Sequence, residues 1–149
     1  MDGSRKAVLA EARTWLRTPY HHRARVKGAG VDCLMLLAEV YERAGTFEMM
    51  GIDPKTLKIP EYPQDIMVHR SEETYLEGLG QYSVETGEIL PGNIAIWKFG
   101  RIFSHAAIII DWPEVIHASR PDGIVTFGDA TKGSLLDREV KFFDPWVQR

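Results

Sequence analysis

The one cysteine of the chain, Cys33, follows a glycine-punctuated segment and opens an apolar stretch. Gly28 and Gly30 let the backbone turn sharply, and Asp32 can cap a helix that starts at Cys33. A thiol in the first turn of a helix lies near unpaired N–H groups and the positive end of the helix dipole, so we expect its pKa to fall. The same N–H groups could face the oxygen of an attacked carbonyl. The segment predicts a nucleophilic cysteine; the alternative is a buried structural thiol.

A nucleophilic thiol needs a group that receives and returns its proton. His105 lies in an apolar stretch over residues 104–110, which is typical of a strand. Small residues beside it, Ser104 among them, leave room for a neighbour or a substrate. We predict His105 as the base, against the alternative of a structural histidine with an ordinary hydrogen bond.

The second ring nitrogen of such a base works best when another polar group holds it. His117 lies on the next predicted strand. If the hairpin pairs Ile109 with Val115, then Ala107 faces His117, and His105 lies diagonally from it on the same face. A slip of one residue would place the two histidines on opposite faces, so this prediction depends on the register.

The remaining pattern places helices first and strands second. Helices are expected over residues 5–17, with Ser4 as cap, from Cys33 to the C′ glycine Gly45, and from Ser71 to about Gly80. Residues 20–30 and 46–70 show no regular period. Strands are expected over residues 93–99, 101–110, 115–118 and 124–127, with a possible edge strand over 141–143. One α+β domain over residues 1–149 follows.

Composition is that of an ordinary globular domain. Hydrophobic residues make up 44% and charged residues 26% of the 149 residues, and the net charge of −3 does not favour nucleic acid as a partner. A single cysteine excludes an internal disulfide and a multi-cysteine zinc site. No apolar run is long enough to span a bilayer. No signal peptide is recognised, so synthesis as a soluble cytoplasmic product is expected.

Four motifs, in this order, resemble those of the NlpC-type cell-wall cysteine peptidases. They are Thr18-Pro19-Tyr20, Gly30-Val31-Asp32-Cys33, Ser104-His105-Ala106 and Ile116-His117-Ala118. The loop over residues 20–28 looks most like the phage-tail branch of that family. The resemblance implies a papain-like fold, in which a helix with the cysteine packs against an antiparallel sheet with the histidines.

The resemblance also implies roles for individual residues. Cys33 is then the nucleophile, His105 the general base and acid, and His117 the residue that orients His105. Tyr20 matches a tyrosine that lines the family's site and can help to hold the oxyanion. Asp32 matches a residue that can contact a substrate amine, although a helix cap explains it equally well. With Tyr20 and Asp32, Ser104 completes the expected substrate-binding group.

The implied reaction is hydrolysis of the γ-D-glutamyl–diamino-acid bond in the stem peptide of peptidoglycan, through a thioester and without cofactor. Leu34 and Met35 stand where the family has small residues, which puts the width of the cleft in question. His21 and His22 could be read as metal ligands, but the remaining candidates give no compact ligand spacing, so no metal is expected. The cations Arg23, Arg25 and Lys27 either bind substrate carboxylates or form a solvated loop.

Other interpretations of the same residues stay open. The Cys–His pair could serve an amidase at the sugar–peptide junction or an acyltransferase. The chain could also be a phage-tail structural protein that kept the fold and lost turnover. For the enzyme, we expect a phage or prophage tail as the setting, with tail proteins as possible partners.

Overall fold

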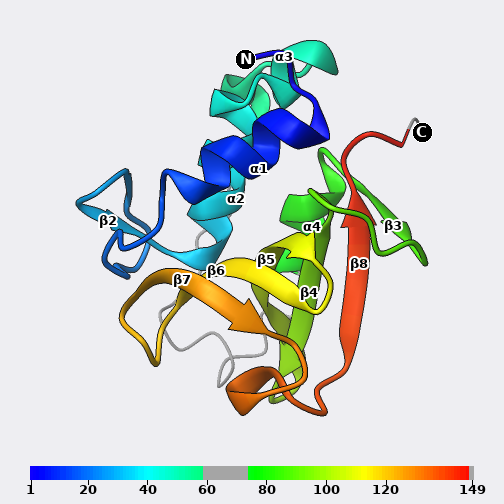
Figure 1. The fold of residues 1–149 in the computed structure, drawn as a ribbon. Coiled ribbons are helices and arrows are strands. Elements are labelled where there is room, and N and C mark those ends of the chain that lie inside the picture. Colours follow the sequence, from blue (N-terminus) through cyan, green and yellow to red (C-terminus); the bar gives the residue numbers. More distant parts are fainter. Residues whose placement is uncertain (59–73, 148–149) are drawn as a thin grey trace.

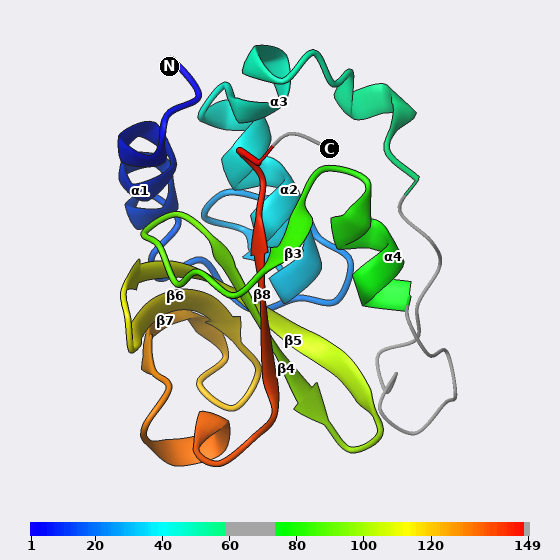
Figure 2. The same ribbon diagram turned by 90° about the vertical axis from the view of Figure 1, so that its right-hand side faces the viewer.

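The computed structural model describes residues 1–58 and 74–147. Helical elements are α1 (Arg5–Arg13), α2 (Cys33–Arg43), α3 (Thr46–Met49), η1 (Pro54–Thr56), α4 (Thr74–Gly80) and η2 (Gly133–Leu135). Strands are β1 (Arg25–Val26), β2 (Gly30–Val31), β3 (Val84–Thr86), β4 (Ile94–Phe99), β5 (Ile102–Asp111), β6 (Glu114–Ser119), β7 (Ile124–Asp129) and β8 (Val140–Asp144). The α+β class is confirmed: helices gather over one side of an antiparallel sheet (Figures 1 and 2).

Local capping chemistry sets the helix ends that the sequence predicts. The Ser4 side chain accepts a hydrogen bond from the Ala7 N–H, and Asp32 accepts one from the Met35 N–H. Gly45 adopts the left-handed conformation, with φ of 88°, directly after the end of α2. The first helix is shorter than expected: it ends at Arg13, because the chain turns away so that the Arg17 N–H can bond to the Val125 carbonyl.

The main sheet has the strand order β3-β8-β4-β5-β6-β7. The strand expected over residues 141–143 is present as β8, but its expected edge position is wrong, because β8 pairs with β4 on one side and β3 on the other. The short strand β3 forms the edge instead, and the sequence did not indicate it. Figure 2 shows β8 in red, shortly before the C-terminus.

Segments expected to be irregular contain short regular elements. Residues 20–30 hold the two-stranded ladder β1–β2, in which Arg25 lies opposite Val31. Residues 46–58 contain α3 and η1. Such short elements carry no sustained hydrophobic period, so the pattern did not reveal them. The predicted helix start at Ser71 and the segment over residues 59–70 lie outside the described residues.

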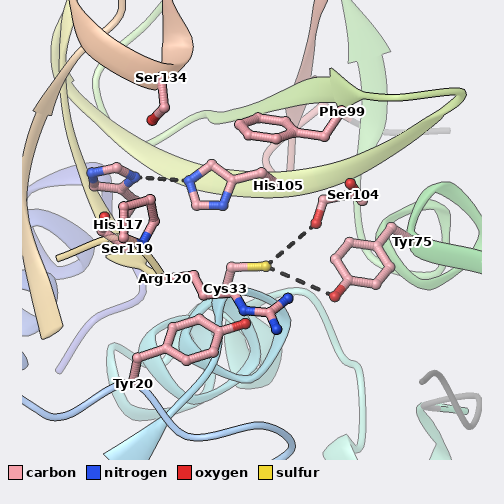
Figure 3. A pocket seen from close by; sticks show the side chains of 11 residues that line it. Tyr20, Cys33, Tyr75, Phe99, Ser104, His105, His117, Ser119, Arg120 and Ser134 are labelled. Carbon is pink, nitrogen blue, oxygen red and sulfur yellow. Dashed lines mark hydrogen bonds between the residues drawn. The ribbon is translucent and has the colours of Figure 1, made fainter. Parts of the chain in front are cut away.

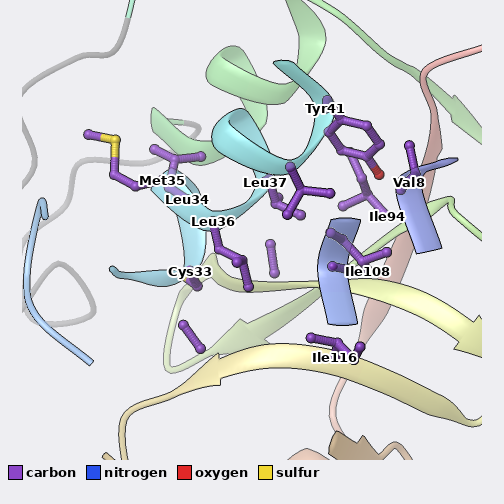
Figure 4. Close-up of a cluster of buried hydrophobic side chains, with 14 of the residues drawn as sticks. Val8, Cys33, Leu34, Met35, Leu36, Leu37, Tyr41, Ile94, Ile108 and Ile116 are labelled. Carbon is purple, nitrogen blue, oxygen red and sulfur yellow. The ribbon is translucent and has the colours of Figure 1, made fainter. Parts of the chain in front are cut away.

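The core sits between α2 and the sheet. Every residue from Cys33 to Tyr41 is buried, as predicted for a helix that is apolar nearly all round. Leu36 and Leu37 pack toward Ile108 and Ile116 of the sheet (Figure 4). Replacing such a leucine by alanine typically costs about 2 to 5 kcal/mol. This packing fixes the helix, and hence Cys33, against β5 and β6.

The opposite face of the sheet carries a second, smaller cluster. Trp97 is fully buried there and stacks on Trp112 at a centroid distance of 6.2 Å. Phe142 of β8 contacts Trp112 edge-on at 5.0 Å. His105 lies beside this cluster, with its ring 5.9 Å from that of Trp97. The base predicted from the sequence is thus held by aromatic packing on one side of its strand.

Candidate active site

Cys33 is the first residue of α2, and Asp32 fixes that position. One Asp32 carboxylate oxygen accepts from the Met35 N–H at 3.0 Å, and the other accepts from the Arg23 N–H at 2.6 Å. The carboxylate therefore caps the helix and ties the preceding loop to it. Asp32 is 1% exposed, and it is not among the described residues that line the cavity. Its predicted contact with a substrate amine stays a prediction.

A β-bulge in β5 presents the backbone around His105 to the cysteine. Trp97 of β4 pairs with His105, but the next residue, Lys98, pairs with Phe103, so Ser104 has no partner opposite. Bulges of this kind bend a strand and redirect its groups, and they are common beside active sites. Here the Ser104 carbonyl oxygen accepts a hydrogen bond from the Cys33 thiol, with 3.6 Å between sulfur and oxygen.

His117 lies on β6 within hydrogen-bond distance of His105. The predicted pairing of Ile109 with Val115 is confirmed, and it places both histidines on one face. Nε2 of His105 is 2.7 Å from Nδ1 of His117. Figure 3 shows the other ring nitrogen of His105 directed toward the side on which Cys33 lies.

This arrangement selects one pair of tautomers for proton transfer. If Nδ1 of His105 is to accept the thiol proton, its Nε2 must carry hydrogen and donate it to Nδ1 of His117. His117 then carries its own hydrogen on Nε2. That atom faces Gly128 of β7, where a β-carbon on residue 128 would lie only 2.6 Å from it. Because Gly128 has no side chain, there is room for the imidazole of His117.

A cavity of about 300 Å³ opens above the thiol. Of the predicted residues, it brings together Cys33, His105, His117, Tyr20 and Ser104. The other described lining residues are Tyr75, Phe99, Ser119, Arg120, Pro121 and Ser134. Figure 3 shows these side chains around the sulfur. Leu34 and Met35, which depart from the family pattern, are buried in the core and do not line it.

Sequence reasoning missed four polar residues of this cavity, Tyr75, Ser119, Arg120 and Ser134. The hydroxyl of Tyr75, on α4, lies 3.9 Å from the sulfur of Cys33. Arg120 follows β6, three residues after His117. Tyr75 is remote from every motif and reaches the thiol only through tertiary packing. Arg120 offered a signal, because it is a cation shortly after a motif histidine.

Burial raises the pKa of the Cys33 thiol to about 12, so the expected fall is wrong for this structure. The negative charge of Asp32 raises it further. Hydrogen bonds from the backbone of Ala106 and Leu34 and from Tyr75 act in the opposite direction, but they are smaller. The sequence indicated the helix N-terminus correctly, but it did not show that Cys33 is only 3% exposed.

Burial also lowers the pKa of both imidazoles. That of His105 falls to about 3, with His117 and the charge of Arg138 adding to the effect of burial. That of His117 falls to about 4, although the carboxylate of Asp122 acts against the fall. Near pH 7 the site therefore holds a neutral thiol beside neutral imidazoles. Such a pair can act by moving the proton from sulfur to His105 as the sulfur attacks a carbonyl.

The basic loop binds carboxylates of the chain itself. Arg25 pairs with Glu39 of α2 at 2.6 Å, and Lys27 pairs with Glu11 of α1 at 2.7 Å. These ion pairs hold the loop that carries Tyr20 against two helices. The result differs from both expectations, because the two cations neither form a purely solvated loop nor line the cavity.

Within residues 1–58 and 74–147, no group of three His, Cys, Asp or Glu side chains is placed to hold a metal ion. In the same part of the chain, no helix has the length and apolar character needed to cross a bilayer.

Solved structures of other proteins share the fold of this chain. No family model and no curated protein matches the sequence. The NlpC/p60 domain of the peptidoglycan hydrolase SagA superposes with a TM-score of 0.58 at 20% identity, covering 93% of this chain and 97% of that one. The chain has the NlpC/P60 fold. The resemblance drawn from the sequence motifs is thus confirmed at the level of the fold.

Two further similar structures differ in how much of them the chain spans. NlpC2 from Trichomonas vaginalis gives a TM-score of 0.63 at 19% identity, and the match covers 99% of this chain but 47% of that one. An N-acetylmuramoyl-L-alanine amidase from Bacteroides uniformis gives 0.52 at 14% identity, with 96% and 98% covered. The chain therefore spans nearly all of the amidase structure and about half of the protein from Trichomonas vaginalis.

Proposed function

We propose that the protein is a cysteine peptidase that hydrolyses the stem peptides of bacterial peptidoglycan. The observation that carries this proposal is the arrangement of Cys33, His105 and His117 around one cavity, with 2.7 Å between the two imidazoles. A structural thiol would need neither a cavity nor a pair of histidines beside it. The NlpC/P60 fold and the peptidoglycan hydrolase with that fold support the substrate class.

The chemistry follows from the neutral state of the site. His105 takes the proton of Cys33 while the sulfur attacks the carbonyl carbon, and His117 accepts the hydrogen bond that holds the resulting imidazolium. The tetrahedral intermediate then collapses to a thioester, and His105 returns the proton to the leaving amine. Water, deprotonated by His105, next hydrolyses the thioester and releases the thiol. Tyr20 lines the cavity and can donate a hydrogen bond to the oxyanion.

For the bond that is cut, we propose the γ-D-glutamyl–diamino-acid bond, on the resemblance of the four motifs. A second candidate is the bond between muramic acid and L-alanine, and the amidase structure with the same fold favours it. Both reactions use the same thiol and base. They differ in which amine leaves.

Mass spectrometry of muropeptides separates these possibilities. Purified sacculi are digested with the wild-type protein, with Cys33→Ala and with Cys33→Ser. Hydrolysis at the γ-D-glutamyl bond releases fragments that begin with a free diamino acid, whereas amidase action releases peptides that begin with L-alanine. We expect the first set from the wild type and neither set from the two variants. Release by folded Cys33→Ala protein, or no release by any form, would contradict the proposal.

For the setting, we propose a phage or prophage tail, supported by the resemblance of residues 20–28 to the phage-tail branch. A tail enzyme acts on polymeric sacculi, whereas an enzyme that recycles wall fragments prefers small free peptides. Comparing kcat/KM on sacculi and on the tripeptide L-alanyl-γ-D-glutamyl-diaminopimelate tests this. A strong preference for the tripeptide, without release from sacculi, would exclude the tail setting.

A further inference from the structure

His117 lies between the catalytic cavity and a second cavity. The second cavity has a volume of about 290 Å³, and His117, Pro121 and Ser134 line both cavities. Figure 3 shows one ring nitrogen of His117 bonded to His105 and the other directed away from it. That other nitrogen, Nε2, lies against Gly128, a residue that lines the second cavity. Charged groups on that side can therefore act on the His117 ring.

Asp122 lines the second cavity from a turn that is fixed in position. The Ser119 hydroxyl donates to Oδ2 of Asp122 at 2.6 Å, and the Asp122 N–H donates to the same hydroxyl at 3.3 Å. Ser119 is 2% exposed, and the Gly123 N–H bonds to its carbonyl at 2.8 Å, which closes the turn. Within residues 1–58 and 74–147, no cation forms an ion pair with the Asp122 carboxylate. Its negative charge is thus held in place just after the strand that carries His117.

The proposed reaction forms a cation where the structure disfavours one. His105 becomes an imidazolium when it takes the thiol proton, and its Nε2 lies 2.7 Å from Nδ1 of His117. Burial lowers the pKa of both rings, and His117 and the charge of Arg138 lower that of His105 further. The carboxylate of Asp122 acts in the opposite direction on the pKa of His117, against the larger effect of burial. A negative charge on this side therefore favours the cation.

The other charged residues of the second cavity largely compensate each other. Asp129 and Lys132 form an ion pair with 3.9 Å between oxygen and nitrogen. Asp129 also accepts hydrogen bonds from the N–H and the hydroxyl of Thr131. Among the described residues that line this cavity, Asp122 is thus the charged group without a compensating ion.

We propose that the Asp122 carboxylate stabilises the imidazolium that forms on His105, and that it does so through His117. This inference rests on the proposed peptidase function. Asp122 is not among the described residues that line the catalytic cavity, so it is a positioning residue rather than a catalytic one. When His105 becomes a cation, it donates more strongly to Nδ1 of His117 and polarises that ring, and a negative charge beyond the ring favours this polarisation.

Replacing Asp122 by asparagine tests the proposal, because the amide oxygen can still accept the hydrogen bond from Ser119 while the charge is lost. With soluble muropeptides as substrate, we expect kcat of Asp122→Asn to fall about 5-fold and KM to change less than about 2-fold. The loss is modest because Asp122 is exposed and water weakens its effect. Asp129→Asn, the matched control in the same cavity, should keep the wild-type kcat. A higher KM with unchanged kcat in Asp122→Asn would overturn the proposal, because it would indicate a contact with substrate.

The same change in a His117→Ala background tests the route through His117. There the loss of kcat caused by Asp122→Asn should shrink to less than about 2-fold, because the ring that transmits the charge is gone. An equal loss in both backgrounds would show that Asp122 acts by another route, and it would overturn the proposal.

NMR titration of the histidine rings makes the outcome independent of turnover. Loss of the Asp122 charge should lower the pKa of His117 further below its value of about 4, whereas Asp129→Asn should leave that pKa unchanged. If the wild type hydrolyses no peptidoglycan and Asp122→Asn still lowers the pKa, the proposed function alone fails. An unchanged pKa of His117 in Asp122→Asn would overturn the role of Asp122.

Discussion

Gly128 of β7 lies against the imidazole of His117 so closely that a β-carbon at position 128 would be 2.6 Å from Nε2. Gly128 is not among the glycines with positive φ, so its backbone conformation suits alanine, and the three atoms nearest to the added β-carbon all belong to the His117 ring. The imidazole that would have to move is the one that holds His105 at 2.7 Å. A residue outside the cavity therefore controls the geometry within it.

Gly128→Ala should lower kcat/KM by about 10- to 100-fold while the protein stays folded, because a displaced His117 no longer orients the base. Gly87→Ala is the matched control, since a β-carbon there meets no atom within 4 Å and its φ is not in the positive region. Kinetics on sacculi and thermal unfolding of both variants check this. An unchanged rate in Gly128→Ala would mean that the position of His117 matters little.

His105→Ala should cost more activity than His117→Ala. His105 carries the proton in both halves of the proposed reaction, whereas His117 orients it and stabilises its charged form. We expect the loss in kcat/KM to be at least about 10-fold larger for His105→Ala. Parallel kinetics of the two variants provide the measurement, and equal or reversed losses would show that the roles are exchanged.

Alkylation of Cys33 should be slower than that of glutathione at pH 7. Because burial raises the pKa of the thiol to about 12, the reactive thiolate is scarce at neutral pH, and its fraction should rise about tenfold with each pH unit up to about pH 10. Since Cys33 is the one cysteine, iodoacetamide labelling followed by intact mass reports it alone. Tyr75→Phe should slow labelling further, because Tyr75 lowers the thiol pKa. A pH-independent fast rate at about pH 6 would instead indicate a preformed thiolate–imidazolium pair.

The folded protein should lose stability as the pH falls from about 7 to about 5. The pKa values of His105 and His117 are about 3 and about 4 in the folded state, below the value of about 6.5 expected after unfolding. The unfolded state therefore binds more protons in this interval, and the stabilisation present above about pH 6.5 is lost on acidification. At pH 5 the loss amounts to about 2 kcal/mol for each histidine.

Chemical denaturation at neutral pH and at about pH 5, with wild type and a His105→Gln/His117→Gln variant, measures this effect. Both proteins share the same carboxylates, so the difference between their pH dependences isolates the two imidazoles. The variant should show the smaller loss. Equal losses would mean that the histidines are already protonated, or solvated, in the folded protein.

The sequence predicted what local chemistry determines. Asp32 as a cap for a helix that starts at Cys33, and the pairing of Ile109 with Val115, follow from short-range patterns, and both are confirmed. The register of this hairpin is sufficient to place His105 and His117 on the same face of the sheet. The essential geometry of the site could be predicted because one helix start and one hairpin generate it.

Features that depend on contacts between distant parts of the chain could not be predicted from the sequence. The bulge at Ser104 arises from the pairing of β4 with β5, and Tyr75 reaches the thiol from α4. The direction of the thiol pKa was predicted wrongly for the same reason: the helix N-terminus is a local feature, whereas complete burial comes from the tertiary structure.

The place of β8 in the sheet bears on how the protein is made. This strand pairs with residues 94–97 of β4, which in turn pairs with the strand that carries His105. A chain emerging from the ribosome exposes Cys33 and both histidines before residues 140–144 are synthesised, and until then the sheet lacks an interior strand. Because a β-sheet gains stability from such non-local pairing, we expect the sheet that holds the three residues to reach its full stability only after residues 140–144 have been synthesised.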